Sequence, residues 1–194
     1  ETWPDEVGTA DATQANASFR PLWKPSLAAF NNRPAIEFSG GRNDQLISAN
    51  YATAFTQPGE LVVIGRDYDD TVDDGGSFAS KDDWMIWRVP PAGTAWQLYA
   101  GSGGVISGAI YDSDVHVFDG ILNTTASDLQ IDGTSVDTGN AGSKTLPNTT
   151  IGHPSSLSTY GTKGITFVGI KDSALSAADR SDLVAWSQGY YSTP

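Results

Sequence analysis

The chain has 194 residues, no cysteine and a formal net charge of −12 at pH 7. The missing cysteines exclude disulfides and thiolate metal sites, and the acidic balance makes nucleic acid and anionic bilayers poor partners. No run of about 18 apolar residues occurs, so no membrane insertion is expected. The length, with no linker or internal repeat, predicts one domain over residues 1–194. Because residue 1 is Glu and no signal peptide precedes the domain, we expect a processed product or a piece of a larger polypeptide.

Residues 1–33 form an irregular entry segment by their composition, with Pro, Gly and small polar residues throughout. Short apolar runs separated by turn residues follow, and these are typical of strands. The predicted strands before the central hairpin cover residues 34–38, 45–49, 59–66, 83–89, 95–100 and 105–111. In residues 59–66 the apolar run is continuous and rich in β-branched side chains, which predicts a buried strand.

The segment 115–136, VHVFDGILNTTASDLQIDGTSV, is the strongest local signal. Apolar residues alternate in its first strand and again around Gln130, and a short polar connection separates the two. Asp132-Gly133 then tolerates the positive φ of a tight hairpin turn. A hairpin of this size is not stable alone, so we expect a second sheet to cover it.

Two further strands, 149–153 and 165–171, and one helix close the chain. Ser176 followed by Asp179 resembles a capping box, and apolar residues then recur at helical spacing. Many short strands with Gly-rich turns and a single terminal helix predict an all-β, two-sheet antiparallel sandwich with a short C-terminal helix.

A series of short motifs runs in order along almost the whole chain. They are Trp3-Pro4-Asp5, Gly8, Ala12-Thr13-Gln14, Arg20-Pro21, residues 32–38 (NRPAIEF) with Gly40 and Leu46, His116-Val117, Leu129-x-Ile131-Asp132-Gly133, Ile151-Gly152, and residues 164–170 and 175–180. Their order resembles the concanavalin A-like lectin/glucanase superfamily, in the laminin-G-like jelly-roll branch of bacterial surface proteins and phage virion proteins. The resemblance implies two curved sheets whose concave face often holds sugars, and many members that serve as structural or adhesive modules. Fold alone does not give function.

Catalytic residues are sparse. Hydrolysis of a glycoside needs two carboxylates about 5–10 Å apart. None of the four Glu residues lies in the alternating acidic pattern that the resemblance implies for hydrolases. Asp112 and Asp114 alternate, but nothing catalytic flanks them, and His116 on an apolar strand is more typical of a hydrogen-bonded structural residue. We therefore expect no enzyme, with a polysaccharide-cleaving hydrolase or lyase as the alternative.

An Asp-rich loop is the candidate metal site. Calcium takes six to eight oxygen ligands, which such a loop can supply. The spacing is not that of an EF-hand, because Val72 stands two positions before Asp74 and no Glu closes the loop. The choice lies between calcium as a cofactor and a solvated acidic loop. The candidate ligands are Asp67, Asp69, Asp70, Asp73 and Asp74.

Aromatic residues gather in one third of the chain and are the candidate sugar-binding residues. Aromatic faces stack on pyranose rings. Trp84 and Trp87, three apart, face opposite sides of a strand, as do Trp96 and Tyr99, so one member of each pair can be exposed. The alternative is that they fill the core or subunit contacts, and Trp3 and Trp186 are assigned to packing. The candidates are Trp84, Trp87, Trp96, Tyr99 and Tyr111.

Together these features predict a non-enzymatic module on a virion surface, as a phage tail or capsid decoration, or an extracellular protein. Its role would be adhesion, with a host-surface glycan or other virion proteins as partners and many copies in one assembly. A calcium-dependent protein-interaction domain is the third hypothesis.

Overall fold

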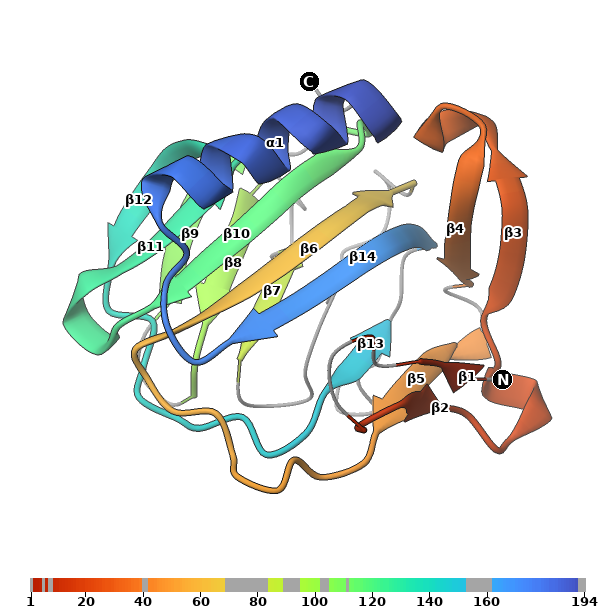
Figure 1. Ribbon diagram of the computed structural model, residues 1–194, viewed down its shortest axis with the longest axis horizontal. Helices are drawn as coiled ribbons and strands as arrows, with labels where there is room; N and C mark the ends of the chain where they lie inside the picture. The colour runs from red at the N-terminus through yellow and green to blue at the C-terminus, as the bar shows by residue number, and fades with distance from the viewer. Residues whose placement is uncertain are drawn as a thin grey trace.

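The computed structural model describes residues 2–4, 6, 9–39, 42–68, 84–88, 95–101, 105–110, 112–152 and 162–191. Within these residues the strands form three antiparallel sheets in two layers, and one helix lies outside them (Figure 1). The larger layer is a seven-stranded sheet in the order β12-β11-β10-β6-β14-β4-β3. Its strands are β3 (Leu22–Leu27), β4 (Arg33–Phe38), β6 (Gly59–Asp67), β10 (His116–Leu122), β11 (Ser127–Ile131), β12 (Thr134–Gly139) and β14 (Lys163–Lys171).

The second layer consists of a four-stranded and a three-stranded sheet. The four-stranded sheet contains β1 (Thr2–Trp3), β2 (Ala12–Thr13), β5 (Gln45–Ser48) and β13 (Thr150–Gly152). The three-stranded sheet contains β7 (Met85–Arg88), β8 (Ala95–Tyr99) and β9 (Val105–Ile110). Short 3₁₀ turns are η1 (Ala17–Phe19), η2 (Ala28–Phe30) and η4 (Thr124–Ala126), and the helix is α1 (Ala177–Tyr191). The predicted fold class, a two-sheet antiparallel sandwich with a C-terminal helix, is confirmed.

The seven-stranded sheet is buried on both faces. Leu61 and Val63 of β6 face the second layer, whereas Val62 and Ile64 face α1 and belong to a second core. Covering by a sheet on one side and a helix on the other explains why the apolar run in β6 is continuous and not alternating.

The predicted hairpin forms as expected. Strands β10 and β11 pair antiparallel, with Phe118 opposite Ile131 and Gly120 opposite Leu129. At the turn into β12, Asp132 and Gly133 have φ values of 51° and 78°, which is the pair of positive φ angles that a type I′ turn requires.

Helix α1 begins at the predicted cap and is fixed to the sheet by an ion-pair network. Ser176 Oγ accepts the Asp179 backbone N–H at 3.1 Å and donates to the Asp179 carboxylate at 2.7 Å. Arg180 reaches the sheet, where it contacts Glu60 of β6 at 2.9 Å and Asp119 of β10. No helix in the described ranges is long and apolar enough to cross a bilayer.

The entry segment is more regular than predicted, because β1, β2 and β3 lie within residues 1–33. Strand β3 is the sheet edge beyond β4, and it leaves both Leu22 and Trp23 exposed. An edge strand has one unpaired side and tolerates Pro25, so it shows neither the alternation nor the absence of proline that identifies an inner strand.

Candidate functional site

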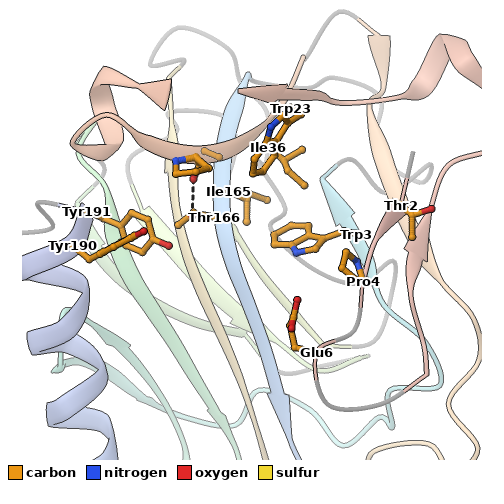
Figure 2. A pocket seen from close by; sticks show the side chains of 12 residues that line it. Thr2, Trp3, Pro4, Glu6, Trp23, Ile36, Ile165, Thr166, Tyr190 and Tyr191 are labelled. Carbon is orange, nitrogen blue, oxygen red and sulfur yellow. Dashed lines mark hydrogen bonds between the residues drawn. The ribbon is translucent and has the colours of Figure 1, made fainter. Parts of the chain in front are cut away.

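A groove of about 450 Å³ opens between the N-terminal segment, the β3–β4 edge and the end of α1. Figure 2 shows Tyr190 and Tyr191 on one side and Trp3 on the other. Ile36 and Ile165 lie between them, so the groove has aromatic walls and an aliphatic floor. The lining residues are Thr2, Trp3, Pro4, Glu6, Trp23, Pro34, Ala35, Ile36, Ile165, Thr166, Tyr190 and Tyr191.

Strand pairing places Trp23 at the rim of the groove. Trp23 lies directly opposite Ile36 in the β3–β4 ladder, so both side chains project from the same face of the sheet. Strand β3 is the edge strand, and Trp23 on it is 57% exposed. An exposed indole on a rigid strand is a ready stacking surface.

Helical spacing builds the opposite wall. Trp186 and Tyr190 are four residues apart on α1 and stack with ring centroids 5.6 Å apart and an interplanar angle of 13°. Tyr191 turns inward and packs edge-on against Phe30 at 6.3 Å. The Arg33 guanidinium lies over the Tyr190 ring, 4.2 Å from its centroid. These contacts hold the wall in place before any ligand arrives.

A local irregularity in β14 brings a polar residue to the floor. The pairing of β14 with β6 shifts between Ile165 and Phe167, and such bulges re-aim side chains. Thr166 consequently lines the groove beside Ile165, and its hydroxyl donates to the Pro34 carbonyl at 3.0 Å (Figure 2). With Thr2 and Glu6, it gives the aromatic groove a few oxygen atoms that can receive hydroxyl donors.

The prediction that Trp84 and Trp96 bind sugar at the surface is wrong, because both side chains lie in the core between the two layers. Trp84 and Trp96 are 0% and 2% exposed. The Trp84 indole N–H donates to the Lys144 carbonyl at 2.7 Å, and the Trp96 ring packs on Phe118 with centroids 4.3 Å apart. Neither ring offers a face to a ligand.

The remaining three aromatic candidates stay predictions. Tyr99 is partly exposed on β8. Trp87 is a residue of β7, but the structure describes only its backbone. Tyr111 lies outside the described residues. The predicted split of Trp96 from Tyr99 across the sheet agrees with the burial of Trp96.

The metal prediction rests on residues that the structure describes only at one end. Asp67 is the last residue of β6 and is buried, opposite Lys163 of β14, so it faces the protein interior and not an open loop. Asp69, Asp70, Asp73 and Asp74 lie outside the described residues. Among the residues that are described, no three His, Cys, Asp or Glu side chains are grouped to hold a metal ion.

His116 is hydrogen-bonded at both ring nitrogens, as predicted for a structural residue. Nδ1 contacts Asp132 at 2.5 Å and Nε2 contacts Asp112 at 2.6 Å. Burial lowers the pKa of His116, but the two carboxylates outweigh it and the pKa is raised above its usual value. Burial likewise raises the pKa of Asp112, and its hydrogen bond with His116 brings the net shift below the usual value.

Sequence reasoning missed the groove although it named some of its residues. Trp3 does pack against the core, as predicted, but it also lines the groove. Trp186 packs against Tyr190 and Tyr191, as predicted, but it remains 46% exposed. The available signal was the four-residue spacing of Trp186 and Tyr190 on the predicted helix, which places both rings on one face.

No protein-family model and no curated protein sequence matches the chain. Solved structures do resemble it. A Trypanosoma rangeli sialidase in complex with 2,3-difluorosialic acid gives a TM-score of 0.67 at 13% identity, covering 94% of this chain and 30% of that one. The binding domain of botulinum neurotoxin DC in complex with SialylT gives 0.65 at 12% identity, covering 96% and 50%.

A third structure concerns botulinum neurotoxin type C, whose cell entry is described as dependent on two ganglioside molecules, with a TM-score of 0.64 at 12% identity. The chain therefore spans half or less of each of these proteins. At such identities the likeness establishes a shared β-sandwich fold. The narrower assignment to the concanavalin A-like, laminin-G-like branch stays a prediction from the sequence.

Proposed function

We propose that this chain is a non-enzymatic module that binds carbohydrate in the aromatic groove. The observation that carries the proposal is the exposed Trp23 indole at the rim of a groove that also holds Trp3 and Tyr190. Protein sites for sugars combine aromatic stacking surfaces with a few polar groups for the hydroxyls. The groove offers both.

The fold neighbours support a glycan as the ligand class. The structures that this chain resembles include a sialidase with a sialic acid analogue and toxin binding domains described with SialylT and with gangliosides. Glycan binding at the surface of a larger assembly, such as a virion, remains our proposal from the sequence resemblance. A role in adhesion follows from it, because one weak site of about millimolar affinity, near −4 kcal/mol, becomes useful in many copies.

A catalytic role is less well supported by the side chains. General-base catalysis needs a nitrogen or oxygen free to reach the substrate. Both nitrogens of His116 are engaged by carboxylates. The other buried acidic pair, Glu60 and Asp119, binds Arg180 between the sheet and α1. Glu60 lines a second pocket, but its carboxylate already accepts from Arg180 and from the Leu175 N–H.

The experiment is a glycan array followed by an NMR titration of the best hit. Trp23→Ala should weaken binding by about two- to tenfold, because an aromatic stacking contact contributes about 0.5–1.5 kcal/mol. Leu22→Ala is the matched control. Leu22 is 45% exposed on the same strand but lies outside the groove, so its loss should leave binding unchanged. If Trp23→Ala and the parent bind the glycan with equal affinity, the groove is not the binding site. If no glycan on the array binds, the proposal of carbohydrate binding is wrong.

A further inference from the structure

The groove carries negative charge where a ligand would lie. Among its described lining residues, Glu6 is the one with a formal charge. Glu6 is exposed beside Trp3 and points into the open part of the groove (Figure 2). A carboxylate accepts hydrogen bonds and donates none, so it suits sugar hydroxyl or amino groups. A ligand carboxylate placed beside it would meet only repulsion.

Two basic side chains that adjoin lining residues, Arg33 and Lys24, already have partners. The Arg33 guanidinium covers the Tyr190 ring at 4.2 Å. Lys24 pairs with Glu37 at 3.3 Å across the β3–β4 ladder. Neither appears among the residues that line the groove. A bidentate Arg is the usual partner for a carboxylate ligand, and the described lining offers none.

The long-range field acts in the same direction. The chain has 23 Asp and Glu against 11 Lys and Arg, so the field of the whole molecule repels anions on approach. Salt screens this field over about 10 Å at 0.1 M, whereas a charge in direct contact with the ligand is screened less. Local and global charge therefore both oppose an acidic sugar.

We propose that the groove selects neutral or amino sugars and rejects glycans whose contacting residue carries a carboxylate, such as sialic acid. This inference rests on the proposed carbohydrate function and defines its ligand class. It sets the chain apart from its fold neighbours, which are described with a sialic acid analogue and with SialylT. The shared sandwich would then hold a site of opposite charge preference.

The test uses the whole chain on an array of neutral oligosaccharides printed beside the same cores capped with sialic acid. The parent should bind the neutral cores and should show little or no binding to the same cores capped with sialic acid. Glu6→Gln should raise binding of capped cores by about fivefold, the equivalent of the roughly 1 kcal/mol between two unit charges 4 Å apart in water. Neutral cores should change little, because the amide still accepts hydroxyl donors.

Asp137→Asn is the control for net charge. It removes one exposed negative charge on β12, at the opposite edge of the seven-stranded sheet from β3. It should not improve binding of capped cores. If it does so as strongly as Glu6→Gln, the local role of Glu6 is wrong.

Two further outcomes separate the inference from the proposed function. If the parent binds capped cores as well as neutral ones, and Arg33→Gln abolishes this, the guanidinium sets a preference for acidic sugars. The inference is then overturned while carbohydrate binding stands. If neither type of core binds, the proposed function fails and the inference fails with it.

Discussion

At the scale of single residues, His116 shows how burial and charge compete. The ring lies between Asp132 at the tip of the β11–β12 hairpin and Asp112 just before β10. The other Asp132 oxygen accepts the Val117 backbone N–H at 2.9 Å. One carboxylate thus ties the turn to the neighbouring strand and also favours the charged form of the imidazole, raising its pKa.

Asp132→Asn should lower the pKa of His116. The variant removes the negative charge beside a buried imidazole, so the effect of burial, which lowers the pKa of His116, is less opposed. Asn tolerates the φ of 51° at this position, and its side-chain oxygen can still accept the Val117 N–H, so the turn should persist. The measurement is the His116 ring-proton NMR shift between pH 5 and 9, with His153→Gln to assign the second histidine. The parent should titrate above pH 6.5. An unchanged midpoint in Asp132→Asn would contradict the ion pair.

At the scale of elements, helix α1 is attached to the sheet through two carboxylates and one guanidinium. Glu60 and Asp119 are 1% and 2% exposed, on the neighbouring strands β6 and β10. Glu60 also accepts the Leu175 backbone N–H just before the helix. Burial, then the hydrogen bond and charge of Glu60, raise the pKa of Asp119 to about 8, although Arg180 opposes the shift. One cation does not neutralise two buried acids.

The raised pKa makes the attachment of α1 sensitive to pH. A carboxyl that titrates near 8 when folded and near 4 when unfolded binds its proton more tightly in the folded chain. Its contribution to stability is complete below about pH 4 and is lost as the pH rises to about 8. Urea unfolding of the parent should therefore show a free energy of unfolding that falls across this range, by at most about 1.4 kcal/mol per pH unit. Asp119→Asn should flatten that slope.

His116 complicates this slope, because a base with a raised pKa also loses its stabilising contribution as the pH rises through that pKa. The contribution is common to the parent and to Asp119→Asn, so the difference between the two curves isolates Asp119. Parallel curves from pH 5 to pH 8 would show that Asp119 does not hold the extra proton.

Local patterns identified most elements because their causes are local. Alternation and the Asp-Gly pair predicted β10, β11 and their turn, and Ser176 predicted the start of α1. The pleat also predicted that Trp96 and Tyr99 would face opposite sides. Which of them faces inward depends on where the seven-stranded sheet lies, and this cannot be inferred from the sequence of a single strand.

At the scale of the whole molecule, the groove could not be predicted because its parts meet only after folding. It joins β1, the β3–β4 edge, the β14 bulge and the last turn of α1. Trp3 and Tyr191 come from nearly opposite ends of the described chain, yet both line it. No spacing rule connects segments so distant in the sequence. The buried strand β6, by contrast, was predicted from the apolar residues within its own short run.

The same scale determines whether one weak site can give firm attachment. The chain has no cysteine, so Asp137→Cys supplies a single attachment point on β12, at the sheet edge away from β3. Biotin placed there and bound to streptavidin presents several grooves at once. On a surface coated with the glycan found by the array, this assembly should bind about 10²–10⁴ times more tightly than the single chain, because later contacts are intramolecular.

The affinity of each groove for the free oligosaccharide should not change. Adding Trp23→Ala should reduce the gain by an order of magnitude or more, since every groove in the assembly is then weakened. An assembly that binds the surface no better than one chain would contradict an adhesive role for the groove.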